Sequence, residues 1–303
     1  MAYGLQTYQD NTRRESLLDM IMDASPDRNP LVTMFGVSKA SNTVHSWVEE
    51  YLARPTSVNT AVEGSDATFA DLTAPARRTN VTQTIRETFR VTDTERATNV
   101  VGGQDPYEYQ MNKAMKGWKN NLEYAIINGA FASGASGSAP QMSGINSIVT
   151  SHYTARNSGT SLSEAEFNDM VLDVALDVGN DNVFDMVVTG LRLRNALSSF
   201  TASSTKFIDS SDKKLINAVQ VYESNSGVHR LFGHLDVPSA AATPGPMVYG
   251  LKESAWKVAY LREPVHIELA KTGSATKGMI EGDATLEFRT ERANARRSGY
   301  LIP

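Results

Sequence analysis

The sequence contains no cysteine, which excludes disulfide bonds, cysteine-based zinc sites, iron–sulfur clusters and thiol catalysis together. It also lacks any apolar run near the roughly 20 residues that cross a membrane, and residues 1–10 lack the apolar core of a signal peptide. A net charge of −5 argues against a protein that grips nucleic acid electrostatically. We therefore expect a soluble, cytoplasmically made protein, without a membrane partner, that is held together by packing.

Motifs for catalysis, cofactors and metals are also missing. Residues 273–278 have the glycine spacing of a phosphate-binding loop, but Met279 and Ile280 stand where lysine and serine or threonine are needed. Three aspartates, at positions 169, 173 and 177, recur four apart, and we interpret them as a solvated helix face. We predict no catalytic, cofactor-binding or metal-binding residue, and no cofactor.

The five histidines show no metal-ligand spacing, and no serine lies in a nucleophile elbow. His229 and His234 flank a short apolar stretch that is typical of a strand or turn. A hydrolase that uses one of them with a nearby carboxylate remains a remote alternative, because a convergent triad leaves no fixed sequence pattern.

One long amphipathic helix is predicted over residues 105–129. Apolar side chains recur at the three- and four-residue spacing of a single helical stripe. Asp105 is a suitable N-cap, Pro106 suits the first helical position, and Gly129 follows the last periodic residue. The face predicted to meet water comprises Lys113, Lys116, Lys119, Asn120 and Glu123.

Two strand-like runs precede this helix, at residues 43–51 and 81–92. Both are rich in β-branched and aromatic residues, and the second has a polar face of period two. They predict the two strands of an extended hairpin, whose connection over residues 53–80 is unusually long. Because an isolated two-stranded ribbon is marginal in water, we expect this hairpin to lie on a neighbouring subunit.

The remaining chain indicates an α+β fold. Residues 1–38, with a short helix over 14–22, have too few apolar residues for a core of their own. A flexible connection is predicted over 130–144, a helix capped by Ser163, a buried strand over 184–189 and a helix over 191–200. Further strands are predicted over 218–222, 247–251, 256–261, 266–269 and 284–290.

Several segments resemble those of a known family. They are ELAKTG at 268–273, IEGDATLEFR at 280–289, ERANA at 291–295, VEGSDATF at 62–69, TNVTQ at 79–83 and LEYAIING at 122–129. In their order along the chain they resemble the corresponding segments of the major capsid proteins of tailed bacteriophages, which have the Hong Kong 97-like capsid fold. The resemblance implies an N-terminal arm over 1–38, an extended loop over 39–92, a peripheral domain over 93–162 and 263–303 with spine helix 105–129, and an axial domain over 163–262.

The resemblance also implies a structural function in the virion. Copies assembled in the host cytoplasm would form hexamers and pentamers of an icosahedral head around double-stranded DNA, bound without sequence specificity. The expected partners are a separate scaffolding protein, since the sequence shows no long coiled N-terminal extension, together with a portal and an optional cement protein. An encapsulin-type cargo shell of the same fold is the alternative.

Four charged residues of the extended loop are the predicted contacts between subunits, because charges on a projecting loop need partners that fix its register. They are Glu63, Asp66, Arg77 and Arg78.

Overall fold

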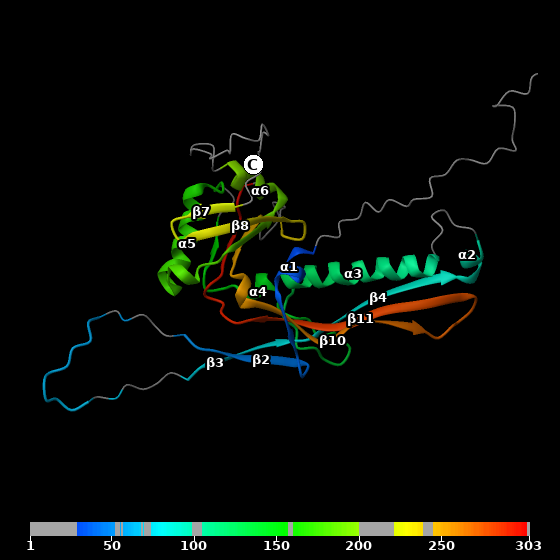
Figure 1. Cartoon of the computed structure of the whole chain (residues 1–303), viewed down its shortest axis with the longest axis horizontal. Helices are drawn as coiled ribbons and strands as arrows, with labels where there is room; N and C mark the ends of the chain where they lie inside the picture. Colours follow the sequence, from blue (N-terminus) through cyan, green and yellow to red (C-terminus); the bar gives the residue numbers. More distant parts are fainter. Residues whose placement is uncertain are drawn as a thin grey trace, which may run out of the picture. The chain divides into compact units, whose positions relative to one another are not determined.

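The computed structural model describes residues 29–51, 55, 57–67, 69, 74–98, 105–156, 160–199, 221–238 and 245–301 (Figure 1). The helix predicted over 14–22, most of the arm and the first part of the strand predicted over 218–222 lie outside these residues. The described chain divides into two compact units. One contains residues 86–118 and 265–281, and the other contains the remaining described residues.

The helix predicted over 105–129 is observed as α3 (Pro106–Asn128). Asp105 caps it, since its Oδ1 accepts a hydrogen bond from the backbone N–H of Tyr107 at 2.9 Å. Along the predicted stripe, burial increases toward the C-terminal half of the helix, where Trp118, Leu122 and Ile126 are at most 1% exposed. Burial of this apolar face, more than helix propensity, stabilises the helix.

Glu123 was predicted to lie on the solvent face of α3, and this prediction was wrong, because its side chain is fully buried. Its Oε1 accepts hydrogen bonds from Leu31 N at 2.9 Å and from His234 Nε2 at 2.8 Å, and its Oε2 accepts one from Val32 N at 2.8 Å. Leu31 and Val32 belong to the first turn of α1 (Pro30–Met34), whose N–H groups have no partner within the helix. A carboxylate can be buried here because these donors replace water.

The end of α3 is fixed by a close approach of two backbone segments. A Cβ atom on Gly129 would lie 2.5 Å from the carbonyl oxygens of both Ala125 and Met142. The connection predicted to be flexible, residues 130–144, instead forms a tight hairpin with bridges between Ala132 and Gln141 and between Ala135 and Ser138. The small side chains that suggest flexibility therefore permit close packing.

The smaller unit packs the first half of α3 onto strand residues. The ring of Phe89 lies 5.1 Å from that of Tyr107 and 5.9 Å from that of His266. Tyr107 Oη and His266 Nε2 are 3.0 Å apart. A Cβ atom on Gly278 would lie within 2.9 Å of all three side chains. Close packing against these side chains therefore accounts for a glycine at position 278, the second glycine of the phosphate-loop-like spacing at residues 273–278.

A four-stranded sheet has the order β1-β10-β11-β4. Its strands are β1 (Gly36–Lys39), β10 (Trp256–Leu269), β11 (Ala275–Phe288) and β4 (Gln83–Thr92). Two predictions were wrong here. The strands predicted over 256–261 and 266–269 are one strand, and the strand predicted to begin at residue 284 begins at Ala275. β10 continues through Pro264, although proline has no backbone N–H to donate to a neighbouring strand. On the β1 side this costs little, because β1 pairs only with residues 257–260 of β10.

A six-stranded sheet has the order β5-β12-β9-β6-β8-β7. Its strands are β5 (Tyr153–Ala155), β12 (Ala295–Ser298), β9 (Met247–Leu251), β6 (Met186–Gly190), β8 (Gly227–His234) and β7 (Val221–Ser224). β6 is parallel to β8 and antiparallel to β9, and both β6 and β9 are entirely buried. The mixed pairing and the helices between strands confirm an α+β architecture.

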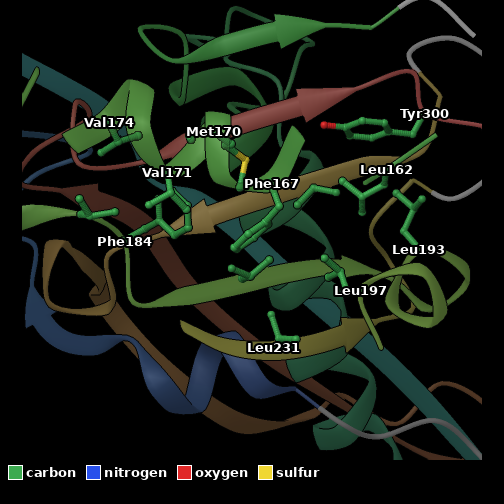
Figure 2. Packing of buried hydrophobic residues seen from close by; sticks show 14 residues of the cluster. Leu162, Phe167, Met170, Val171, Val174, Phe184, Leu193, Leu197, Leu231 and Tyr300 are labelled. Carbon is green, nitrogen blue, oxygen red and sulfur yellow. The ribbon is translucent and has the colours of Figure 1, made fainter. Parts of the chain in front are cut away.

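Two helices enclose the core of this sheet, α5 (Glu164–Val178) and α6 (Leu191–Ser199). Ser163 caps α5 as predicted, with its side chain accepting a hydrogen bond from Glu166 N at 3.3 Å. Figure 2 shows side chains of α5 pointing toward those of the strands and of α6. The buried cluster includes Phe167, Met170, Val171, Val174, Phe184, Leu193, Leu197 and Leu231. The remaining short elements are α2 (Asp93–Ala97), α4 (Ile145–Ile148), η2 (Asn180–Asn182) and η4 (Glu253–Ala255).

The extended hairpin exists, but its second strand is not the predicted one. β2 (Val44–Glu49) pairs antiparallel with β3 (Ala76–Val81), in a register that runs from Val44↔Val81 to Glu49↔Ala76. The run predicted to pair with β2 is β4, which belongs to the four-stranded sheet. The chain passes between the sheets at Thr82, which is buried and bonds through its backbone N–H to Thr43 O at 2.8 Å. Alternation identified β4 as a strand, but it could not identify its neighbour.

Candidate functional site

The hairpin of β2 and β3 extends into a long exposed connection (Figure 1). Every described residue from 51 to 79 is exposed. The connection turns at Val62, whose carbonyl accepts a hydrogen bond from Ser65 N at 3.0 Å. Gly64, between them, has φ +78°, as the third position of a type II turn requires. The name extended loop is kept below for residues 51–75, the outer part of the segment predicted over 39–92. Its tip is a defined turn, and none of its described residues is buried.

Three apolar side chains of the extended loop face solvent. Val58 is 85% exposed, Val62 is 79% exposed and Phe69 is 96% exposed. Burying each of them against a partner would contribute on the order of 1.5–3 kcal/mol. A projecting segment with several such side chains is typical of a protein–protein contact.

The four predicted contact residues fall into two groups. Glu63 lies in the turn at the tip and Asp66 just after it, and neither has a hydrogen-bond or ion-pair partner among the described residues. Arg77 and Arg78 lie on β3, where Arg77 Nη2 donates to Ser46 Oγ at 3.0 Å. Arg78 Nε donates to Glu49 Oε2 at 2.8 Å. The arginines thus brace the hairpin across its two strands, whereas the carboxylates remain available.

A polar cluster holds the base of the hairpin against β11. Glu287 accepts hydrogen bonds from Ser38 Oγ at 2.8 Å and Arg289 Nε at 3.2 Å, and its Oε2 lies 3.1 Å from His45 Nε2. Burial alone raises the pKa of Glu287, but these hydrogen bonds outweigh it, so the pKa lies below the ordinary value of 4.5. Next to this cluster, the ring of Trp47 meets that of Phe288 edge-on at 4.9 Å.

A second cluster holds the start of the extended loop at the C-terminal end of α5. Tyr51 Oη donates to Asp177 Oδ1 at 2.9 Å, and the Arg292 guanidinium lies 4.0 Å from the Tyr51 ring centre. Arg292 Nη1 also lies 3.2 Å from Asp177 Oδ1. The hydrogen bond to Asp177 raises the pKa of Tyr51. A groove of about 690 Å³ lies beside these residues and is lined by Tyr51, Leu176, Asp177, Val178, Gly179, Asn182, Thr290 and Ala293.

The predicted acidic helix face is only partly solvated. Asp169 is exposed, but Asp173 pairs with Arg297, and Asp177 Oδ2 lies 3.2 Å from His152 Nε2. Among the described residues, no group of three potential ligands could hold a metal ion. Asp173 and Asp177 thus attach α5 to strand and loop residues of the same unit.

The histidines considered for a hydrolase have structural contacts. His234 bonds to the buried Glu123. The ring of His229 lies 2.9 Å from Phe184 O through Nδ1 and 2.7 Å from Ser224 Oγ through Nε2, and burial lowers its pKa. A backbone carbonyl thus takes the place that a carboxylate has in a catalytic triad.

In the part of the chain that the structure describes, no helix combines the length and the apolar character that crossing a membrane requires.

Solved structures of several shell-forming proteins are similar to this chain. The capsid of a native GTA particle has a TM-score of 0.69 at 10% identity and covers 97% of both chains. The capsid of Myoviridae phage XM1 has a TM-score of 0.60 at 12% identity and covers 94% of this chain and 96% of its own. An encapsulin complex from Synechococcus elongatus PCC 7942 is also similar, with a TM-score of 0.62 at 9% identity, covering 100% and 97%. The fold is thus the mixed α+β Hong Kong 97-like capsid fold, which phage capsids and encapsulins share.

Sequence similarity separates these two possibilities. The sequence model of the family described as SU10 major capsid protein matches residues 3–300, so the chain belongs to this family. The major capsid protein of Escherichia phage Phieco32 is 26% identical over 345 aligned positions, which cover 98% of this chain and 96% of that protein. The protein is a structural component of a phage head and not an enzyme. The hydrolase alternative is therefore set aside, and so is the encapsulin alternative.

Sequence reasoning missed the groove beside α5 and the cluster around Asp177. These residues come from separate parts of the chain, and no spacing in the sequence indicates that they meet. The apolar residues of the extended loop could have been noticed, because Val58, Val62 and Phe69 lie in a segment without periodicity.

Proposed function

We propose that copies of this chain form the hexameric and pentameric rings of an icosahedral head, and that the extended loop of each copy lies on an adjacent copy. The observation that carries this proposal is the exposure of every described residue from 51 to 79, including three apolar side chains. A two-stranded ribbon has too little core to be stable alone. Contacts between a projecting loop and a different surface are heterologous, and heterologous contacts close into rings when the rotation fits.

Glu63, Asp66, Arg77 and Arg78 are the proposed contacts between copies. The two carboxylates at the tip have no partner among the described residues of their own chain, so a neighbouring copy can provide one. The two arginines bond across the hairpin and keep it extended. In this proposal the carboxylates select the register with the neighbour. The arginines contact the neighbour as well, and through their bonds across the hairpin they hold the loop in the conformation that reaches it.

The test is a double charge reversal at the tip, Glu63→Lys with Asp66→Lys. We expect the yield of closed shells in negative-stain electron microscopy to fall severely, while the circular dichroism and thermal midpoint of the unassembled subunit stay unchanged. The matched control is Glu108→Lys with Asp169→Lys, which reverses two exposed carboxylates elsewhere and changes the net charge equally. Wild-type yields of shells from the tip variant would refute the assignment.

Reversing Arg77 and Arg78 is a less specific test. Arg78→Glu removes the 2.8 Å bond to Glu49 and places two carboxylates at diagonal positions on the two strands, where Arg78 faces Trp47 and Glu49 faces Ala76. We expect this double variant to impair assembly by loosening the hairpin itself, and normal shells from it would contradict the bracing role.

The subdomain assignment is also a proposal: an arm over 1–38, an extended loop over 39–92, a peripheral domain over 93–162 and 263–303, and an axial domain over 163–262. Membership of a capsid family and the position of α3 support it. We further propose that a scaffolding protein, a portal and an optional cement protein are partners. Packaged double-stranded DNA would be held without sequence-specific contacts, and the acidic net charge supports this.

A further inference from the structure

The groove beside Tyr51 has the chemistry of a peptide-binding surface. Leu176, Val178 and Ala293 provide apolar contact, while Asn182 and Thr290 provide hydrogen-bonding groups in the same lining. Leu176 is 65% exposed although it belongs to a helix whose opposite face is in the core. A groove that combines apolar walls with a few polar groups suits an extended peptide with a large apolar side chain.

Cationic groups lie at the edge of this groove. Arg292 is 42% exposed and bonds to Asp177, one of the lining residues. Lys252 Nζ donates to the carbonyl oxygens of Asp181 and Val183, both at 3.2 Å, on either side of the lining residue Asn182. These two cations can pair with carboxylates of a bound peptide at the edge, while Asp177, which is paired with Arg292, lines the groove itself.

The extended loop has the complementary chemistry. Between Pro55 and Ala76 the sequence contains Glu63, Asp66 and Asp71 but neither lysine nor arginine. The same segment carries Phe69, which is 96% exposed and large enough to fill an apolar groove.

The length of the extended loop indicates whether it can occupy the groove of its own chain or that of another copy. Its strands separate after the Glu49↔Ala76 pair, and its tip turns at residues 62–65. About a dozen extended residues on each side span roughly 40 Å. Tyr51 lines the groove at the base of the loop, so an extended loop carries its tip away from the groove of its own chain.

We propose that this groove receives the extended loop of a second copy, with Phe69 as the apolar anchor and the acidic tip residues beside Arg292 and Lys252. The inference rests on the proposed function, in which the loop lies on an adjacent copy, and it names the surface that the loop meets. Tyr51 lies at the base of the extended loop of its own copy and also lines the groove that would receive the loop of another copy. A loop bound in this groove would therefore also support the base of the loop of the copy that it binds. Such a contact is head-to-tail and repeats around a ring.

The test uses disulfide trapping, since the natural chain has no cysteine that could form a background cross-link. Subunits with Phe69→Cys are co-assembled with subunits that carry Leu176→Cys, oxidised and analysed by non-reducing electrophoresis. In the matched control, Leu235→Cys replaces Leu176→Cys. Leu235 directly follows the C-terminal end of β8 and has a similar exposure of 61%. A disulfide requires Cα atoms within about 7 Å, so we expect roughly tenfold more dimer with Leu176→Cys than with the control.

Other outcomes separate this inference from the proposed function. Shells that form but give no excess dimer at position 176 would overturn the groove assignment, while the loop would still contact a neighbour elsewhere. An oxidised doubly substituted chain that runs as a compacted monomer would also overturn it, because the loop would then fill its own groove. Where Phe69→Cys prevents assembly, Ala67→Cys takes its place, because residues two apart lie on the same side of an extended segment, and absence of dimer with it overturns the inference as well.

Discussion

The buried carboxylate of Glu123 provides the sharpest test of how this fold is stabilised. Replacing Glu123 by alanine removes the acceptor for three donors at once: the N–H groups of Leu31 and Val32 and the ring N–H of His234. His234 Nδ1 accepts a hydrogen bond from Asp236 N at 3.0 Å, so Nε2 carries the proton that Glu123 receives. The substitution therefore leaves α1 and β8 without their shared partner on α3.

The expected loss follows from the burial of these donors. A buried donor without an acceptor costs about 1–3 kcal/mol. Leu31 and His234 are 1% and 4% exposed, so both costs apply, whereas the N–H of Val32 is only partly buried. We expect Glu123→Ala to lower the free energy of unfolding by about 4 kcal/mol, a large part of the roughly 5–15 kcal/mol of a typical protein.

A glutamine at the same position should have an intermediate effect. Glu123→Gln keeps an oxygen for Leu31 and His234 but turns an NH₂ group toward the N–H of Val32, which should cost about 1–2 kcal/mol. Glu108→Ala is the control, because Glu108 is an exposed glutamate on the same helix and should change stability by at most about 0.5 kcal/mol.

The assay is urea unfolding of the unassembled subunit, followed by circular dichroism and tryptophan fluorescence. Coincident transitions from the two probes are needed before a free energy is assigned. Equal losses for Glu123→Ala and Glu108→Ala would refute the reasoning. A double-mutant cycle with His234→Ala should give a coupling energy of about 0.5–3 kcal/mol, and additive losses would contradict the shared contact.

Three further predictions concern the helix ends and the hairpin base. Gly129→Ala should prevent folding or lower the thermal midpoint sharply, because its Cβ would collide with two backbone carbonyls. Gly117→Ala, within α3, should cost far less in the same thermal scan, because its Cβ would come no closer than 3.5 Å to the Glu87 side chain. Ser163→Ala should lower the free energy of urea unfolding by about 1 kcal/mol through loss of the cap on α5, and no change would contradict that role. The pKa of Glu287 lies below its ordinary value of 4.5, so its ionised form stabilises the fold above that pH and the contribution is lost as the pH falls below it. Glu287→Gln should therefore flatten the dependence of stability on pH between about 5 and 3, and a slope equal to that of the wild type would refute this.

Local sequence patterns predicted individual elements well where one side of an element is buried. The stripe of α3, its Asp105 cap and the Ser163 cap of α5 each depend on residues within one or two helical turns, so the sequence alone reveals them. The same holds for the alternation of β4, whose exposed and buried faces follow a period of two. The resemblance of short segments also indicated the correct family, because each segment is contiguous in the chain.

Pairing and burial of polar groups depended on distant parts of the chain. β3 contains two arginines and no run of apolar residues, so its pairing with β2 could not be predicted from its composition. Glu123 has the position of a solvent-facing residue on a helical wheel, and its burial depends on donors about 90 residues earlier and about 110 residues later.

The sequence by itself determined the class of fold, the long helix, the existence of a projecting loop and the structural role, because each follows from local periodicity, composition or family resemblance. The tertiary structure alone decided which strands pair, where Glu123 finds its donors and where a groove opens beside Tyr51. These features come from residues that are far apart in the chain and meet only when the sheets and helices pack. Whether a buried polar group finds hydrogen-bond partners depends on all the segments that pack around it and not on any one segment.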